Sequence, residues 1–409
     1  MFNLKNFTFL LFIAWLPVSA QIEPPKVGGL FQVWYTQMMD SNLRYFDQYS
    51  TGYLTPFMGV APQYKENTLA IKRIDLKVSG RISDNVEYYI NIDPTINNTG
   101  PTSVLLQDVF IKYKMPHQLE LMVGQFKPFQ TLDGFTPPPN YLFVEYTQLA
   151  NLFTPRDRGA WLSKGFGDPS ALGGRIHVGM VNGNTKANDA NAQKEIVARL
   201  DMNYGRQHTF GAYAMQGGSD QADNGSLNAK VFQGPDAPSQ QEVLDNNDKT
   251  DHYGIFYVFQ NEKFYASGEV MTGLWGRRAF PSVYSGATAP PLSANRVHLD
   301  QSFLSYVGVL AYTHNRHHKF LARYDMMDYN YGDKWYTSSN PYIQESGDYS
   351  PKITEVTFGY TYVFLPDRYS AANIKVNYTM RSKNFMYPRD GQSGPQGGDS
   401  LVIAFQVGF

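Results

Sequence analysis

The sequence predicts an all-β protein, a transmembrane antiparallel β-barrel of about 16 strands, on three observations. Apolar and polar residues alternate with period two along many segments, which is typical of strands with two different faces. Long and short joins between these segments alternate along the chain. The last segment presents one wholly apolar face and ends at Phe409.

The first twenty residues predict a secretory signal peptide instead of a part of the fold. Lys5 gives a positive start, residues 7–16 are almost wholly apolar, and small residues precede Ala20. A membrane anchor is the alternative, but the apolar run is too short to span a bilayer as a helix. We expect cleavage before Gln21, with residues 1–20 as signal peptide and residues 21–409 as the barrel.

Composition narrows the class of protein. The chain has no cysteine, which excludes disulfides, cysteine metal sites and cysteine nucleophiles. It has 35 basic and 36 acidic residues, and loss of Lys5 with the signal leaves 34 − 36 = −2. No bulk positive charge is available to attract nucleic acid, so no nucleic-acid partner is expected. Frequent Tyr, Phe and Gly favour strands and turns over helices.

Period-two alternation identifies the clearest strands, taken in order along the chain. Each has apolar residues at every second position and polar residues between them, so the two sets lie on opposite faces. The segments are residues 73–78, 86–93, 119–123, 196–203, 355–362 and 374–381. Soluble sandwiches also show this alternation, so the connections must decide the class.

The connections sort into two kinds that alternate. Tight or slightly longer turns fall at residues 83–85, 116–117, 165–173, 205–207, 261–263, 315–318 and 365–370. Long joins fall between them, at residues 40–66, 95–102, 127–157, 183–193, 217–250, 275–301, 330–351 and 384–399. An outer-membrane barrel has short periplasmic turns and long outer loops, whereas a Greek-key sandwich has no reason to sort its loops.

The final strand supports a barrel in lipid. Leu401, Ile403, Phe405 and Val407 share one apolar face with Phe409, and Gln406 lies on the other face. A membrane barrel needs its apolar side outward, and closure satisfies its backbone groups within the hydrocarbon layer.

The sequence resembles the phosphate-selective porins of the O and P type. The similarity is diffuse over residues 28–409 and clearest at residues 31–35, 73–77, 86–89, 106–110, 123–129, 156–159 and 322–325. It implies a sixteen-stranded homotrimer in the bacterial outer membrane that passes small anions such as phosphate. It also implies that Phe409 is the signal read by the barrel-assembly machinery, and that the third outer loop folds into the pore.

The third long join, residues 127–157, is therefore expected to be a constriction loop. It carries many aromatic residues, so disorder is unexpected and burial against the inner wall is favoured. Lys127, Arg156 and Arg158 are its candidate ion-path residues, with Lys164 just after it. Fixed charges in a narrow pore select ions, and Arg and Lys bind anionic oxygens.

Strand parity predicts further inward cations: Arg73, Lys77, Arg175, Arg199, Arg323, Lys375 and Arg381. Acidic residues also face inward by parity, namely Asp75, Glu87, Asp93, Asp201, Glu269, Asp325 and Glu355. Partnership in a wall salt bridge is the alternative role for each cation. The near balance of signs leaves a non-selective general porin open.

Two smaller clusters have simple interpretations. His314, His317 and His318 could hold a metal by spacing, but they flank a tight turn, and solvated turn residues are expected instead. Trp34, Tyr35, Tyr146 and Trp275 lie near expected strand ends, where an aromatic girdle would sit.

The function expected from the sequence is passive diffusion of small hydrophilic solutes, with anions favoured. No catalytic residue, cofactor or metal site is predicted. A barrel enzyme, lipase-like or protease-like, is the alternative from another class, although the chain lacks a Gly-x-Ser-x-Gly run. An energy-coupled importer is disfavoured, because residues 21–27 are too few for a separate plug domain before Gly28, and an adhesin role for the long loops is left as an alternative.

Overall fold

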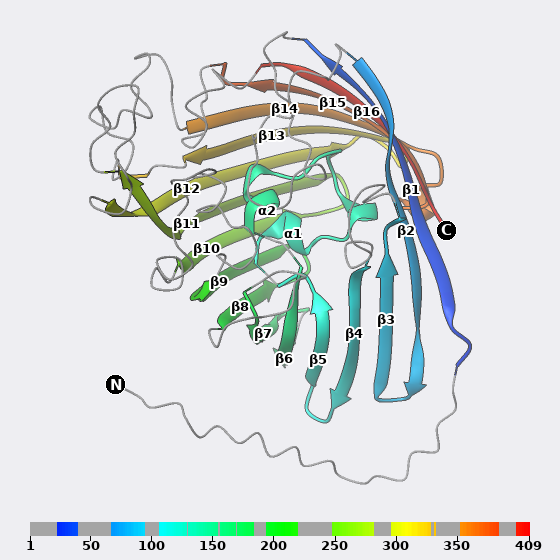
Figure 1. Cartoon of the computed structure of the whole chain (residues 1–409). Coiled ribbons are helices and arrows are strands. Elements are labelled where there is room, and N and C mark those ends of the chain that lie inside the picture. Colours follow the sequence, from blue (N-terminus) through cyan, green and yellow to red (C-terminus); the bar gives the residue numbers. More distant parts are fainter. Residues whose placement is uncertain are drawn as a thin grey trace.

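The computed structural model is a closed antiparallel barrel of sixteen strands. The structure describes residues 23–39, 67–94, 106–128, 130–153, 156–168, 170–183, 194–219, 248–281, 296–328, 331–332, 352–383 and 398–409. The expected signal peptide, residues 1–20, lies outside the described residues. Figure 1 shows the strands following one another round the barrel in chain order.

The strands differ considerably in length. Their bounds are β1 (Lys26–Met38), β2 (Asn67–Ser83), β3 (Val86–Ile92), β4 (Leu106–Met115), β5 (Leu119–Phe126), β6 (Asp157–Gly167), β7 (Leu172–Val181), β8 (Glu195–Tyr204), β9 (His208–Ser219), β10 (Asp248–Gln260), β11 (Phe264–Pro281), β12 (Arg296–Thr313), β13 (His318–Asp328), β14 (Lys352–Val363), β15 (Ala372–Arg381) and β16 (Ser400–Gly408).

The barrel closes between its first and last strands. β1 pairs with β16 from Leu30 opposite Gly408 to Met38 opposite Ser400. Every strand is hydrogen-bonded to two neighbours, so the sheet has no free edge. Closure matters because an unpaired backbone group in hydrocarbon is costly. The strand number and antiparallel order expected from the sequence are confirmed.

The alternation of short and long joins is also confirmed. All seven predicted turns lie between the expected strands, and the predicted long joins connect the opposite ends of those strands. The join predicted at residues 275–301 was too long, because β11 continues to Pro281 and β12 begins at Arg296. Cross-strand pairing, with Arg277 opposite Asp300, extends these strands through residues without apolar alternation.

The two faces of each strand differ as predicted. On β16, Val402, Ala404 and Gln406 are buried, whereas Phe405 and Val407 are exposed. Polar side chains such as Gln32 and Gln406 meet on the inward side, where their amides hydrogen-bond at 2.8 Å. The apolar side therefore faces outward and the polar side inward, the arrangement of a barrel in lipid.

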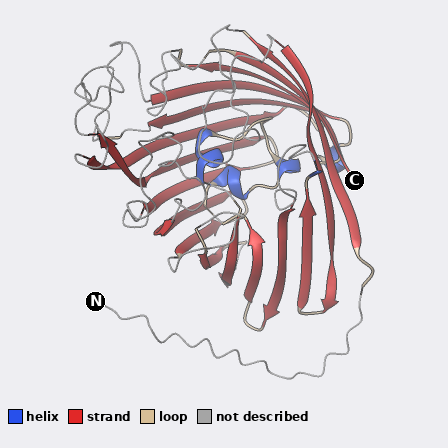
Figure 2. Ribbon diagram, in the orientation of Figure 1, coloured by secondary structure: helices blue, strands red, loops and turns tan. Residues whose placement is uncertain are grey.

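Helical structure is confined to short pieces. The join between β5 and β6 contains α1 (Leu132–Phe135), a 3₁₀ helix (Pro138–Asn140) and α2 (Gln148–Phe153). The Thr131 hydroxyl caps α1 by accepting the Gly134 N–H at 3.0 Å. Figure 2 shows these helices in blue within the ring of red strands.

Among the described residues, no helix has the length and apolar character needed to cross a bilayer.

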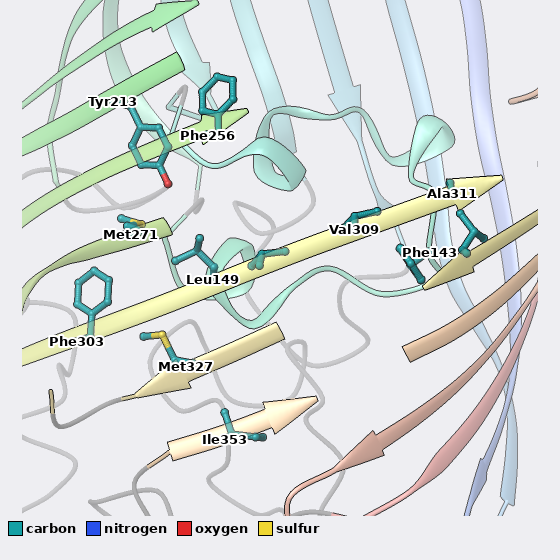
Figure 3. Close-up of a cluster of buried hydrophobic side chains, with 12 residues drawn as sticks. Phe143, Leu149, Tyr213, Phe256, Met271, Phe303, Val309, Ala311, Met327 and Ile353 are labelled. Atoms are coloured by element: carbon teal, nitrogen blue, oxygen red, sulfur yellow. The ribbon is translucent and has the colours of Figure 1, made fainter. Parts of the chain in front are cut away.

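Part of the inner wall forms an apolar core with the β5–β6 join. Phe143 and Leu149 of the join are buried against side chains of β9 to β14. Figure 3 shows Leu149 close to the strand that carries Val309, with Met271, Phe303 and Met327 around it. A second contact joins Val144 to Trp34 of β1 and Val402 of β16, at the seam where the barrel closes. Apolar side chains of the join thus bury surface on two parts of the wall.

Two of the four residues expected in an aromatic girdle lie elsewhere. Trp34 faces inward against Val144, and Tyr146 packs on Tyr141 within the join, so neither belongs to a girdle. Tyr35 does lie on the outward face, opposite Ile403, and the Trp275 side chain lies outside the described residues. Aromatic pairs cluster instead beside the short turns, as in Phe264–Tyr312, Phe320–Tyr360 and Tyr362–Phe364.

Candidate functional site: the inner wall and the β5–β6 segment

The β5–β6 segment, residues 127–156, is attached to the inner wall by charged side chains. Arg199 Nη1 donates to the Gln130 carbonyl at 2.5 Å, and Arg323 Nη1 donates to the Glu145 carbonyl at 2.8 Å. Lys375 Nζ donates to the Tyr141 carbonyl at 2.6 Å. These bonds supply donors to carbonyls that have no partner in a strand ladder.

Carboxylates and an amide of the wall accept the backbone N–H groups of the same segment. The Leu132 N–H donates to Glu269 at 3.1 Å, and the Gln148 N–H donates to Asp325 at 2.6 Å. The Val144 N–H donates to Asn377 Oδ1 at 2.9 Å. Side chains of β8, β11, β13 and β15 therefore bind both the carbonyl groups and the N–H groups of the segment.

These contacts change the role of three predicted ion-path residues. Arg199 and Arg323 are each 4% exposed and Lys375 is 3% exposed, so solute cannot reach them in this state. Arg381 is also engaged, with Glu355, with the Ser400 hydroxyl and, at 3.6 Å, with Glu145. All four face inward as predicted, but their described contacts are with the segment and with neighbouring wall groups.

Lys127 and Arg156 lie at the two ends of the segment, on the inward side of the barrel. Arg156 binds Asp108 with two hydrogen bonds, at 2.9 and 3.0 Å. Lys127 Nζ donates to the Tyr146 hydroxyl at 2.7 Å and lies 4.8 Å from the centre of that ring. Desolvation, followed by the charges of Arg156 and Arg73, lowers the Lys127 pKa well below its ordinary value.

Two predicted ion-path residues face away from the lumen. Gly159 lies on the same inward face of β6 as the buried Trp161. Arg158 is the neighbour of Gly159 and so lies on the outward face, where it is opposite Gln125. Lys164 is exposed and is opposite Ile176, an exposed outward residue. The sequence interpretation failed because β6 begins at Asp157, so strand parity already applies at Arg158. Both cations belong to the outer face of the barrel.

The inward face of β2 to β7 carries cations that share carboxylates. We call Arg73, Lys77, Arg81, Lys112, Lys114 and Arg175 the basic wall. Glu120 Oε1 lies 3.2 Å from Lys112 and 3.7 Å from Arg175. Glu87 lies 2.5 Å from Lys114 and 3.4 Å from Arg81, and Asp75 contacts both Lys77 and Arg73. Arg73 also meets Asp93 at 4.0 Å and Arg81 meets Glu23 at 3.7 Å, so the local positive excess is clearest at Glu120, which faces both Lys112 and Arg175.

Exposure adds to this excess. In the Arg175–Glu120 pair the cation is 43% exposed and the acid 17%, and in the Lys114–Glu87 pair the values are 42% and 27%. Lys77 is 21% exposed beside Asp75 at 4%. The cations thus expose more of their side chains than their carboxylate partners do, although Glu87 and Glu120 also remain partly exposed.

The basic wall includes residues that the sequence analysis missed. Lys112 and Lys114 were not selected, yet they alternate with the outward residues Ile111 and Tyr113. That period-two pattern was the signal that could have identified them.

Two carboxyl groups of the segment sit in poorly hydrated surroundings. Desolvation raises the pKa of Asp133, although the Arg323 charge and a hydrogen bond from the Thr147 N–H oppose the shift. Desolvation likewise raises the pKa of Glu145, against the charge of Arg381. Docking the segment therefore disfavours the charged form of both groups.

The histidines at the β12–β13 turn have ordinary partners. His317 Nδ1 lies 2.8 Å from the Val363 carbonyl oxygen, and His318 Nδ1 lies 2.7 Å from the Tyr360 hydroxyl. Within the described part of the chain, no group of three or more potential ligands is arranged to hold a metal.

A closed barrel with an apolar outside, a charged inside and an attached inner segment defines a membrane pore protein of the outer-membrane type. The family model of the phosphate-selective porins O and P matches residues 55–323. The chain belongs to this family, and it is an outer-membrane porin.

Solved porin structures share the fold at low sequence identity. The OmpF complex with daunomycin from Salmonella typhi has a TM-score of 0.53 and 9% identity, covering 94% of this chain and 97% of that one. An anion-selective porin from Comamonas acidovorans gives 0.51 and 10%, over 94% and 99%. OmpT of Vibrio cholerae, in-vitro folded and in a trimer form, gives the same values. No curated protein matches the sequence significantly.

Proposed function

We propose that the protein is a trimeric, passive diffusion pore for small hydrophilic solutes that favours anions such as phosphate. The observation that supports anion preference is the basic wall, where Asp75, Glu87 and Glu120 each face two cations that are more exposed than themselves. Inside a pore, fixed charge near the path controls which ions enter.

The β5–β6 segment is proposed to be the constriction. Its hydrogen bonds to β8, β11, β13 and β15 favour a position beside that half of the wall, so solute would pass along the basic wall. Arg156 and Lys127 would lie beside this path. We expect the pore to favour anions without excluding cations, because every cation of the basic wall has a carboxylate partner.

Trimer formation and export are proposed on separate grounds. A trimer form of OmpT of Vibrio cholerae shares the fold, which supports the same assembly here. Cleavage of residues 1–20 would deliver the chain to the periplasm, and the barrel-assembly machinery would insert it into outer-membrane lipid.

The test is the reversal potential in a planar bilayer under a salt gradient. Replacing Lys112, Lys114 and Arg175 together by Gln should shift it toward cations. A charge about 8 Å from an ion in water contributes about 0.5 kcal/mol, so each removal should change the permeability of each ion about twofold, in opposite directions for anions and cations. The matched control is Lys164→Gln, which removes an exposed charge on the outer face.

Unchanged selectivity in the triple variant would overturn the role of the basic wall. A barrel enzyme is the competing class of protein, so the purified protein would also be assayed for ester hydrolysis. Turnover of a chromogenic ester by the purified folded protein, above a heat-denatured control, would contradict a purely passive pore.

A further inference from the structure

Two aromatic side chains stand side by side on the inner wall, among the cations of the basic wall. Tyr89 of β3 is the cross-strand partner of Phe110 of β4, and their rings stack with centroids 5.1 Å apart and planes at 18°. Both lie on the inward face, because their chain neighbours Ile90 and Ile111 are exposed outward residues. The stacking distance is close to the strand spacing of about 4.8 Å, so the rings stand on edge on the wall.

The two ends of this stack differ. Phe110 packs against an apolar cluster of the wall that includes Phe126 and Trp161. On the β2 side, the partner of Tyr89 is Ser79, whose side chain is too small to cover an aromatic ring. Among the described residues, Phe110 is the one ring in contact with Tyr89, and no cation lies over the Tyr89 ring. The face of Tyr89 that points toward β2 is therefore left for a solute.

Polar groups surround this open ring face. Neither the Tyr89 hydroxyl nor the Ser79 hydroxyl makes a hydrogen bond within the described part of the chain, and neither oxygen is buried, so both meet water in the lumen. Lys77 and Arg81 lie two residues to either side of Ser79 on the same face of β2, 21% and 48% exposed. Glu87, the next inward residue of β3, lies 3.4 Å from Arg81.

These groups match the chemistry of a sugar ring that carries a negative charge. The C–H groups on one face of a pyranose are slightly positive, and the face of an aromatic ring is negative. Hydroxyls of the sugar can bond the free hydroxyls of Ser79 and Tyr89 and the carboxylate of Glu87. A phosphate or carboxylate on the ring can bind Arg81 or Lys77. Inorganic phosphate would use the cations and leave the aromatic face unused.

We propose that Tyr89 and Ser79 form a stacking site for six-membered sugar rings that bear an anionic group. The sugar lies over Ser79 and continues the row of Phe110 and Tyr89 at the spacing of the strands. This inference rests on the proposed function, in which anions enter the lumen, and it adds the class of solute.

Block of the ion current through single channels in a planar bilayer measures this binding. Glucose 6-phosphate and glucuronate carry both ring and charge, glucose carries the ring alone, and glycerol 3-phosphate carries the charge alone. In the wild-type channel, an anionic sugar should half-block the current at an about fivefold lower concentration than glycerol 3-phosphate, as expected for one aromatic contact. Glucose should block more weakly than the anionic sugar. The stronger blocker of the two anionic sugars identifies the anionic group.

Two variants test the site by different routes. Tyr89→Leu keeps apolar volume but removes the ring, so the advantage of the anionic sugars over glycerol 3-phosphate should disappear. Ser79→Leu keeps the ring and covers its open face, with the same expected result. Tyr113→Leu is the matched control, because it removes an exposed aromatic ring from the outward face of β4 and should leave the block unchanged. Heat-modifiable migration on gels would show that each variant is folded.

Three outcomes would count against the site. Equal block by both anionic sugars and glycerol 3-phosphate in the wild-type channel would overturn it, as would a ring preference that survives in both lumen variants. Block by glucose as strong as that by the anionic sugars would overturn the anionic class. The reversal potential of the same channels separates the two proposals: anion preference without ring preference overturns the stacking site alone, whereas cation preference overturns the proposed function.

Discussion

At the scale of the residue, the strand face on which a cation lies and the burial of its side chain together decide its role. Arg199 and Lys112 both point inward, but Arg199 is buried in bonds to Gln130 and Asp201, whereas Lys112 remains partly open. Arg158 and Lys164 lie on strand β6 at outward positions. A shift of one residue in a strand exchanges lumen for exterior, so charge alone does not identify a pore residue.

Asp133 allows a test of pH dependence at this scale. Its pKa is raised in the docked segment, so docking carries a penalty above that pKa, and the penalty disappears as the pH falls toward 3.8. Asp133→Asn keeps an acceptor for the Thr147 N–H but removes ionisation. We expect slower proteolysis within residues 127–156 than in wild type at pH 7, and equal rates near pH 4.

Asp168 supplies a control, because its pKa is shifted in the opposite direction to that of Asp133. Hydrogen bonds from the Ser170 N–H and hydroxyl lower the Asp168 pKa, so its stabilisation is present at neutral pH and is lost as the pH falls through that pKa. Asp168→Asn should therefore cost stability at pH 7 and little in acid. Faster proteolysis of the β5–β6 segment in Asp133→Asn at pH 7 would contradict the first expectation.

At the scale of the element, the β5–β6 segment is ordered by the wall more than by its own helices. α1 and α2 have 4 and 6 residues, too few to be stable alone. Side chains of β8, β11, β13 and β15 supply the missing hydrogen bonds, and Phe143 and Leu149 supply apolar burial. The position of the segment is therefore a property of the barrel.

Removing two anchors should loosen the segment. Arg323→Gln with Lys375→Gln deletes two charged hydrogen bonds to carbonyls, each contributing about 1.5–3 kcal/mol. We expect a larger and noisier single-channel conductance and faster proteolysis within residues 127–156. Both readouts follow from the segment moving away from the wall.

Lys319→Gln is the matched control for this experiment. Lys319 Nζ lies 4.2 Å from the centre of the Tyr369 ring, and this cation–π contact is with the wall instead of the segment. Losing its charge should alter selectivity without loosening the segment. Equal conductance changes in the control and the double variant would show that charge, not anchoring, causes the effect.

At the scale of the whole molecule, one seam completes the barrel. β1 and β16 are hundreds of residues apart, and their pairing is extended by hydrogen bonds between Gly29 and Phe409, at 3.0 and 3.2 Å. A Cβ at Gly29 would lie 2.4 Å from the Phe409 ring and 2.7 Å from the Asp75 carbonyl oxygen, and the backbone contact is the one that requires glycine, because the exposed ring can move. Phe409 thus takes part in the pairing that closes the barrel.

Deletion of Phe409 tests the proposed assembly signal. We expect less heat-modifiable folded barrel in cells, with refolding from denaturant into detergent less affected, since the machinery is absent there. Gly29→Val is the companion variant: it keeps Phe409 but displaces its ring and also clashes with the Asp75 carbonyl oxygen of β2, so we expect it to reduce refolding in detergent as well as folding in cells. Normal folded yield in cells after the deletion would contradict the signal role.

The sequence by itself determined the strand order, the antiparallel barrel and the two faces, because period-two alternation and join length are local properties. It also identified residues 127–157 as a distinct join between β5 and β6. The tertiary structure decided what each charge contacts: Arg199, Arg323 and Lys375 bind the segment, and Lys112 shares Glu120 with Arg175. These partners come from strands far apart in the chain, and only cross-strand register and burial bring them together.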